Sequence, residues 1–174
     1  MRVWSELQTV QGRNVTLVYR VNSRQRLIIV SNAIEQMQAF AQIQGMQHEA
    51  GGVLLGRHLL DGYDVVVDEV TAPQPADRRS RFSFFRSAEH ELLAQAHWRN
   101  NGGKSAYLGL WHTHPEPDPT PSHVDQTDWN RAVRGDAFEG DRLFFPIIGT
   151  RYLRVWALSR RGKLRLLNQD VSND

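Results

Sequence analysis

The chain has 174 residues, 40% of them hydrophobic and 23% charged, which predicts one globular domain with its own core. Without cysteine it can form neither disulfides nor thiolate metal sites, and a formal net charge of +2 does not indicate a nucleic-acid partner. No apolar run approaches the roughly 20 residues that cross a bilayer. The N-terminal stretch MRVWSELQTV has no apolar secretory signal. We therefore expect a cytoplasmic protein without membrane segments.

Strand and helix patterns alternate in the first half of the chain. Residues 26–32 are typical of a short buried strand that runs into a helix start at a serine or asparagine. The next residues carry an apolar stripe at helical spacing, formed by Ile34, Met37, Phe40 and Ile43. Residues 50–59 and 63–70 then predict two strands joined by a turn at Asp61 and Gly62. This half predicts a helix packed on a sheet.

The second half predicts two more helices and a closing set of strands. A polar loop over residues 71–85 leads into a helix that Ser87 would cap and a glycine pair would end. The remaining elements are a strand, a proline-rich loop, a helix and an antiparallel meander, over residues 106–114, 115–121, 122–134, 142–150, 152–159 and 163–169. Together the patterns predict a single α/β domain over residues 1–174, with a mixed, mostly antiparallel sheet flanked by about three helices.

The stretch GLWHTHPEPDPTPSHVD concentrates groups that can bind a metal. Because side chains alternate across a strand, His112 and His114 project from one face about 7 Å apart along the backbone, and the residue between them points away. The prolines then end the strand, so that Ser122 opens a helix with Asp125 in its first turn. Two imidazoles and one carboxylate are a ligand set of catalytic zinc, which keeps a fourth tetrahedral position for water.

Each piece of this stretch also has an ordinary structural explanation. Histidines at alternate strand positions occur without metal, and a serine followed three residues later by an acid is a common helix cap. His123 is the rival third ligand, although on a helix it points away from the face of Ser122 and Asp125. Glu116 and Asp118 lie in the proline loop, where solvation is the ordinary expectation. The spacing alone leaves the metal site and the structural explanation open.

A second stretch, HEAGGVLLG at residues 48–56, places a glutamate before a glycine-containing strand. The combined order of glutamate, His-Thr-His-Pro, serine and aspartate resembles the motif of the JAMM metalloproteases, also called MPN-domain proteases. Its positions are Glu49, His112, Thr113, His114, Pro115, Ser122 and Asp125. The resemblance covers roughly residues 30–160 and implies an MPN domain of cytidine-deaminase-like fold.

The resemblance also implies a role for each motif residue. Zinc would be held by His112, His114 and Asp125, with a water as the fourth ligand. Glu49 would deprotonate that water and then pass the proton to the leaving amine. Ser122 would donate a hydrogen bond to the developing oxyanion, an interaction commonly worth about 3 kcal/mol. The implied activity is that of a zinc-dependent isopeptidase or peptidase.

The same resemblance implies a protein substrate, cut after the C-terminal tail of a ubiquitin-like protein or of another conjugated protein. Such a tail would lie extended in a groove. The groove walls would be the loop of residues 72–87 and the segment of residues 134–142. The expected substrate contacts are Arg78, Arg79, Arg81 and Trp111, and the arginines have an equal alternative as a solvated loop.

The absence of cysteine sets this chain apart from the endosomal deubiquitinases of the family, because the extra zinc knot of that group cannot form. The chain is more similar to bacterial stand-alone JAB-domain proteins encoded beside E1- and E2-like enzymes, including those of antiphage CBASS operons. That similarity implies a protein conjugate as substrate and an E1- or E2-like enzyme as a partner.

Three other functions are weighed against this one. A JAMM peptidase that trims a ubiquitin-like sulfur carrier would use the same site. A RadC-like protein shares a similar histidine-and-aspartate motif, but often carries a helix-hairpin-helix segment in front, for which the residues before the first predicted helix are too few. A non-catalytic MPN scaffold would have lost ligands, whereas the motif positions here are intact.

Overall fold

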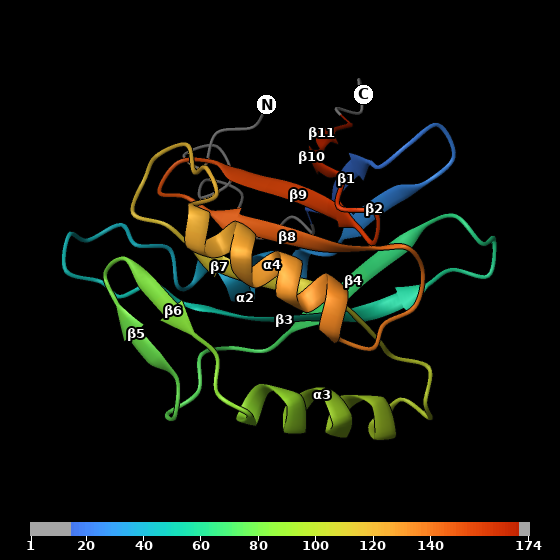
Figure 1. The fold of residues 1–174 in the computed structure, drawn as a ribbon, viewed down its shortest axis with the longest axis horizontal. Helices are drawn as coiled ribbons and strands as arrows, with labels where there is room; N and C mark the ends of the chain where they lie inside the picture. Colours follow the sequence, from blue (N-terminus) through green and yellow to red (C-terminus); the bar gives the residue numbers. More distant parts are fainter. Residues whose placement is uncertain (1–14, 171–174) are drawn as a thin grey trace.

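The structure is a computed structural model that describes residues 15–170 (Figure 1). The N-terminal stretch in which the sequence predicts no secretory signal lies outside these residues. In chain order the elements are β1 (Leu17–Arg20), β2 (Arg26–Ile29), α2 (Ser31–Gln38), β3 (Gly51–His58), β4 (Val65–Val70), β5 (Arg78–Ser80), β6 (Ser83–Phe85), α3 (Glu89–Asn100), β7 (Ala106–Thr113), α4 (His123–Gly135), β8 (Arg142–Ile148), β9 (Leu153–Ser159), β10 (Leu164–Leu166) and β11 (Asn168–Gln169). Among the described residues, none of the helices combines the length and apolar character that a membrane crossing needs.

One nine-stranded sheet organises the described part of the chain, in the order β10-β9-β8-β7-β3-β4-β2-β1-β11. Neighbouring strands are antiparallel except for the pairs β2–β4 and β7–β8, which are parallel. Leu166 of β10 pairs with β9, while Asn168 of β11 pairs with β1, so a single short segment joins the two edges of the sheet. The prediction of a mixed, mostly antiparallel α/β fold is confirmed.

Helices cover both faces of this sheet (Figure 1). Alternation along β3 sends Leu54 into one core, which α2 completes with Ile34 and Met37. Val53 and Leu55 enter the other core, which α4 completes with its buried residues Trp129, Ala132 and Val133. Burial of each large apolar side chain contributes about 1.5–3 kcal/mol, so both helices are held mainly by these faces. The metal-ligand motif lies on the α4 side.

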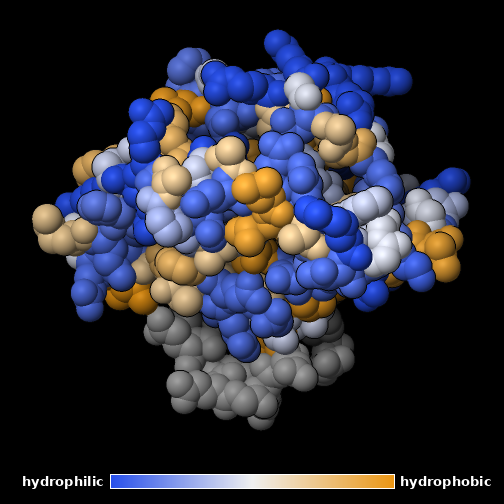
Figure 2. Space-filling model, turned by 90° about the horizontal axis from the view of Figure 1, so that it is seen from below, coloured by the Kyte–Doolittle hydropathy of each residue, from blue (hydrophilic) through white to orange (hydrophobic). Residues whose placement is uncertain are grey.

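The third helix, α3, is less embedded than the other two. Among its residues only His90 is buried, while Leu92 and Trp98 are 61% and 53% exposed. Figure 2 shows the face of the molecule seen from below in Figure 1, with small apolar islands in a mainly hydrophilic surface. The helix therefore stands off the sheet and leaves space beneath it.

Several sequence-based boundaries are wrong. Helix α2 ends at Gln38, so the stripe does not extend to Ile43, which is 61% exposed. Ala88 takes the N-cap position of α3 in place of Ser87. The segment of residues 71–85 is not only a loop, because β5 and β6 pair within it as a hairpin. Strands of three residues have too little pattern to be recognised, and their stability comes from the contacts described below.

Candidate active site

Strand β7 brings two histidines to one face of the sheet. His112 and His114 are 8% and 5% exposed, and their Nε2 atoms lie 3.0 Å apart. The ring of Trp129 packs edge-on against His112, with centroids 6.3 Å apart, and closes the site from the α4 side. Thr113 points to the opposite face, as strand alternation predicts. The strand therefore aims both imidazoles at one point.

The proline loop after β7 is held to the β8–β9 turn. The N–H of Thr150 donates to the carbonyl of Glu116 at 2.8 Å, and the N–H of Tyr152 donates to that of Pro117 at 2.9 Å. Arg154 donates two hydrogen bonds to the Asp118 carboxylate, at 2.6 and 2.7 Å. Asp118 is 52% exposed, in agreement with the expected solvation, and it also pairs with Arg154. These contacts fix where the loop delivers α4.

The start of α4 places Asp125, the acidic side chain expected as the third ligand. Ser122 Oγ accepts the N–H of Asp125 at 3.1 Å, and Asp125 Oδ2 accepts the N–H of Ser122 at 2.6 Å, which forms a capping box. The cap fixes the carboxylate so that Oδ1 lies 3.3 Å from His112 Nε2 and Oδ2 lies 3.2 Å from His114 Nε2. The capping and metal-binding explanations are compatible, because one residue serves both.

These three side chains can hold a metal ion. One ligand atom each from His112, His114 and Asp125 lies within 4.8 Å of the others. Tetrahedral zinc with bonds of about 2.0–2.2 Å separates its ligand atoms by about 3.3–3.5 Å, close to the 3.0–3.3 Å observed between these groups. The rival ligand His123 is exposed and does not belong to the cluster. The donor set and its spacing fit zinc.

The second ring nitrogen of His114, Nδ1, points away from the ligand cluster toward the proline loop. This atom is buried without a hydrogen-bond partner among the described residues, and the Oε1 atom of Glu116 lies 3.6 Å away. The other oxygen of Glu116 accepts the N–H of Thr120 at 3.2 Å. Carboxylates beside the outer nitrogen of a ligating histidine fix its tautomer and orientation. Glu116 is therefore placed for a role that the sequence analysis did not assign.

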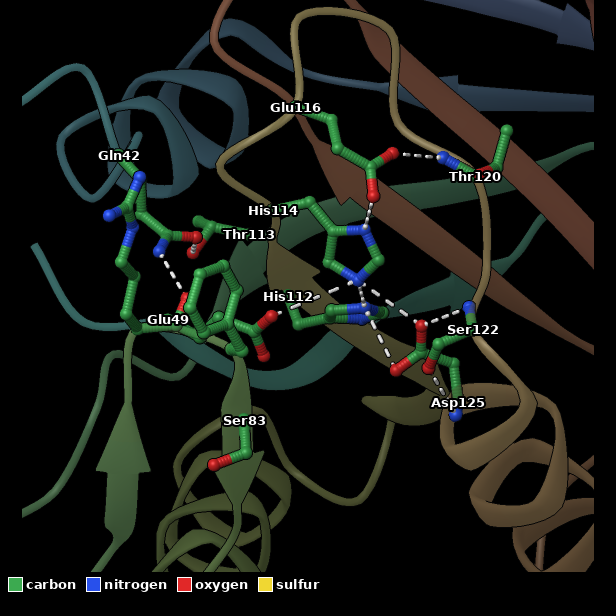
Figure 3. Close-up of polar contacts among 12 residues, drawn as sticks. Gln42, Glu49, Ser83, His112, Thr113, His114, Glu116, Thr120, Ser122 and Asp125 are labelled. Atoms are coloured by element: carbon green, nitrogen blue, oxygen red, sulfur yellow. Dashed lines mark hydrogen bonds and ion pairs between the residues drawn. The ribbon is translucent and has the colours of Figure 1, made fainter. Parts of the chain in front are cut away.

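Glu49 reaches the same centre from the segment that enters β3 (Figure 3). Its side chain is buried, and Oε1 lies 3.9 Å from His114 Nε2. Burial raises the pKa of Glu49 to about 7, although the proximity of His114 opposes the shift. A carboxyl group with such a pKa can both accept and return a proton near neutral pH.

The charges of the ligand cluster are set by burial and by mutual hydrogen bonds. Burial raises the pKa of Asp125, but hydrogen bonds from both histidines and from the Ser122 N–H outweigh it, so the pKa lies well below its usual range. Burial lowers the pKa of His112. For His114 the hydrogen bond and charge of Asp125 outweigh burial and raise the pKa. Asp125 is thus an anion ready to receive a cation.

The three predicted arginine contacts differ in their surroundings. Arg78 and Arg81 are exposed, and their guanidinium groups lie over the rings of Phe85 and Phe82. Arg79 instead donates from Nε to the carbonyl of Glu49 at 2.7 Å. Only the first two are free to meet a substrate through their guanidinium groups.

The prediction that Trp111 contacts substrate is wrong. Its side chain is 0% exposed in the sheet core, and Nε1 donates to the carbonyl of Thr71 at 3.0 Å. On β7 it alternates with His112, so it faces the α2 side of the sheet, away from the metal ligands. Trp111 supports the strand and does not line the site.

A cleft of about 970 Å³ lies between α3 and the end of α4, with β3 and β7 as its floor. Both segments expected to form groove walls contribute to it, through Arg86 and Ser87 on one side and residues 135–139 on the other. None of the three arginines of the hairpin lines it. Its floor residue Leu110 lies two positions before His112 on the same face of β7, so the cleft runs along the sheet face that carries the metal ligands.

Two buried polar side chains behind the site make contacts that the sequence pattern did not predict. Thr113 Oγ1 accepts the N–H of Ala50 at 2.9 Å and donates to Gln42 Oε1 at 3.0 Å. Gln42 in turn donates to the carbonyl of Arg81 at 2.9 Å. Thr113 has a signal in its place between the two histidines, whereas Gln42 has none, because it falls within a segment expected to be helical.

Comparisons with known proteins point to one family and one activity. Residues 30–160 match the family described as prokaryotic homologs of the JAB domain. A Pseudomonas aeruginosa protein named CD-NTase/cGAS isopeptidase is 36% identical over 63% of this chain and 69% of its own length. A Vibrio cholerae protein of the same name is 30% identical over 79% of this chain and 85% of its own length. These relatives confirm the predicted enzyme class, an isopeptidase, and hence a conjugated protein as the kind of substrate.

A solved structure supports the fold alone. A Desulfitobacterium hafniense protein, determined in solution, superposes with a TM-score of 0.55 at 23% identity, over 82% of this chain and 88% of its own. The family match spans most of the chain and includes every motif position from Glu49 to Asp125. The chain therefore belongs to the prokaryotic JAB-domain family.

Proposed function

We propose that this chain is a zinc-dependent isopeptidase that releases a protein joined to another through its C-terminus. One observation carries the proposal. Ligand atoms of His112, His114 and Asp125 lie within 4.8 Å of one another, and the buried carboxylate of Glu49 stands beside them. Three protein ligands next to a carboxylate base are what a hydrolytic zinc site requires. We also propose that residues 1–174 form one MPN domain, since the described strands apart from the β5–β6 hairpin share one sheet.

The Nε2 atoms of His112 and His114 and a carboxylate oxygen of Asp125 would hold the zinc. When bound, zinc supplies Lewis acidity, which polarises the scissile carbonyl and makes water acidic enough to attack it near neutral pH. Asp125 contributes a full negative charge, because its pKa is far below neutrality. Glu116, close to His114 Nδ1, favours the tautomer whose Nε2 lone pair faces the centre.

Glu49 would move the proton. Its carboxylate takes a proton from the attacking water and returns it to the nitrogen of the leaving amine, so that the amine departs neutral. The raised pKa of Glu49, about 7 in the metal-free protein, matches a group that must do both. With Oε1 at 3.9 Å from His114 Nε2, Glu49 lies next to the ligand cluster without being one of its close members.

Ser122 would stabilise the oxyanion that develops on the substrate carbonyl. Its Oγ accepts the N–H of Asp125, so its own hydroxyl proton remains available to donate. The side chain is held by the capping box, and preorganised donors of this kind are worth about 3 kcal/mol in the transition state.

The cleft between α3 and α4 is the proposed path of the substrate tail. It is lined by apolar floor residues and by the polar ends of both wall segments, which suits an extended peptide with backbone and side-chain contacts. The exposed guanidinium groups of Arg78 and Arg81 are proposed as further contacts with the body of the substrate.

The likeness to proteins named CD-NTase/cGAS isopeptidases suggests which conjugate is cut. We infer that the substrate is a CD-NTase joined through its C-terminus to a target, and that an E1- or E2-like enzyme makes the bond. We also propose a cytoplasmic location for the reaction, because a conjugating enzyme of that kind would draw on cytoplasmic ATP.

A cleavage assay with measured metal content tests this function. The probe is a fusion with a fluorescent protein after the C-terminus of a bacterial CD-NTase, beside a matched fusion built on a ubiquitin-like sulfur carrier. We expect one zinc per chain, cleavage of the first fusion, and a loss of kcat of about 10²–10⁴-fold in Glu49→Gln. Glu35→Gln, the same change at an exposed helix position, is the control and should cleave normally. A metal-free protein, or a Glu49→Gln variant as active as wild type, would favour a non-catalytic scaffold, and preference for the carrier fusion would favour the sulfur-carrier peptidase.

A further inference from the structure

The β5–β6 hairpin holds the backbone of Glu49 on both sides. The N–H of Glu49 donates to the carbonyl of Ser80 at 2.7 Å, and the carbonyl of Glu49 accepts Nε of Arg79, also at 2.7 Å. A second guanidinium nitrogen of Arg79 lies 3.5 Å from the carbonyl of His48. Both main-chain polar groups of Glu49 are thus bound by two consecutive residues of the hairpin.

Glu49 depends on these contacts because of where it lies in the chain. Strand β3 begins only at Gly51, so Glu49 precedes the part of the chain that the sheet ladder holds between β4 and β7. The next residue, Ala50, is bound to β7, the strand that carries His112, since its N–H donates to Thr113 Oγ1 at 2.9 Å. Glu49 itself lies between the Ala50–Thr113 hydrogen bond and the contacts with the hairpin. The direction of its carboxylate is therefore set by how the hairpin is seated.

The hairpin is seated by packing as well as by hydrogen bonds. A Cβ at Gly51 would come within 2.6 Å of the Phe84 ring, so the ring of β6 lies directly on the backbone of β3. At the hairpin tip, Gln42 binds the carbonyl of Arg81 and the hydroxyl of Thr113. The hairpin, Glu49 and the strand between the two ligating histidines form one connected unit.

We propose that Arg79 is a positioning residue for Glu49, and that the seating of the β5–β6 hairpin sets the turnover of the enzyme. This inference rests on the proposed function. Arg79 acts through the Glu49 carbonyl and does not touch substrate, unlike the exposed Arg78 and Arg81. A displacement of a reacting group by about 1 Å can cost about 10²-fold in rate. Contacts of a substrate with the outer face of the hairpin would then alter catalysis through Arg79.

The first test separates kcat from KM. In Arg79→Ala we expect kcat on the CD-NTase fusion to fall by about 10–100-fold with KM and zinc content nearly unchanged. Arg79→Lys, which keeps one donor, should recover part of the loss, and added guanidinium at millimolar concentration should rescue Arg79→Ala. Arg78→Ala and Arg81→Ala should change KM. Arg99→Ala is the matched control, because its Nε also donates to a backbone carbonyl, that of Gln95 on exposed α3, and its kinetics should match wild type.

The second test needs no activity. Amide hydrogen exchange of the metal-free protein should show the Glu49 N–H exchanging at least about 10-fold faster in Arg79→Ala than in wild type. Wild-type exchange at Glu49 in the variant, or a defect confined to KM and not rescued by guanidinium, overturns the inference. If wild type leaves every fusion uncut, the proposed function fails, and the exchange measurement alone still decides whether Arg79 holds Glu49. Should Arg79→Ala unfold, the same two measurements are made on Arg79→Lys.

Discussion

Asp77 lies at the centre of a buried hydrogen-bond network behind the active site. Its side chain is 0% exposed and accepts the backbone N–H groups of Gln74 and Ser87, at 2.7 and 2.8 Å. It also binds His90 Nε2 at 2.8 Å, and the other nitrogen of His90 lies 2.6 Å from Thr71 Oγ1. The network ties both ends of the segment that carries the β5–β6 hairpin to the core. Asp77→Asn should therefore weaken both stability and the seating of the hairpin.

The size of the effect follows from the burial of the pair. Asparagine keeps the shape of Asp77 but removes its charge. It also replaces one carboxylate oxygen, an acceptor, by an NH₂ group, a donor, which would face the N–H groups that Asp77 now accepts. Hydrogen bonds to a charged group contribute about 1.5–3 kcal/mol each, and the amide loses at least one of the bonds that Asp77 accepts while it leaves a buried N–H group unpaired, so we expect a cost of about 3–5 kcal/mol. In a domain of this length each kcal/mol lowers Tm by about 2–4 °C, so we expect a fall of roughly 6–20 °C.

The pH dependence gives a second signature of the same network. Burial raises the pKa of Asp77, but the N–H groups of Gln74 and Ser87 and the contact with His90 outweigh it, so the pKa in the folded protein lies below its usual value. A lowered folded pKa stabilises the protein above the unfolded pKa of about 3.9, and this stabilisation is lost as the pH falls through both values. The gap in Tm between wild type and Asp77→Asn should be full at about pH 7 and smaller at about pH 3.

Thermal unfolding followed by circular dichroism between about pH 3 and pH 7 measures the fall in Tm of Asp77→Asn and its change with pH. Asp170→Asn is the control, since Asp170 pairs with Arg20 at the surface, where the side chains are 33% and 58% exposed. Such a pair contributes about 0–1 kcal/mol. The reasoning is refuted if Asp77→Asn melts no lower than the control variant at about pH 7, or if its gap to wild type stays constant on acidification.

Three further predictions concern the metal centre. Because the pKa of His114 is raised, protons should compete with zinc, and competition with a chelator should show affinity falling as the pH drops from about 7.5 to about 6. Ser122→Ala should lower kcat by about 10²-fold and destabilise α4 by about 1 kcal/mol. Ser122→Thr keeps the hydroxyl and should retain most of the wild-type kcat and most of the stability of α4. Equal kcat in the two variants would contradict the oxyanion role. Gly149→Ala should weaken zinc binding, because the added Cβ would lie 2.6 Å from Pro119 Cδ and push the proline loop that delivers Asp125; zinc affinity equal to wild type in a titration would contradict this.

Much of the candidate metal cluster is predictable because its spacing is local. His112 and His114 share a face through strand alternation, and the pattern of Ser122 and Asp125 encodes a cap that also aims the carboxylate. The substrate contacts were harder to predict. The sequence does not distinguish Arg79 from the neighbouring Arg78, yet Arg79 binds the carbonyl of Glu49. Nor does it distinguish Trp111 from a surface tryptophan, yet Trp111 lies in the core.

The sequence by itself determined the class of fold, the order of the main elements and the members of the His112, His114 and Asp125 cluster, because these follow from periodicity, turn chemistry and motif spacing within short stretches. The tertiary structure alone decided how distant segments meet. It placed Glu49 at 3.9 Å from His114 across 65 residues, and it seated a hairpin of two three-residue strands on Gly51. Such contacts depend on shape and on buried hydrogen bonds between remote parts of the chain, and these leave no periodic signal in the sequence.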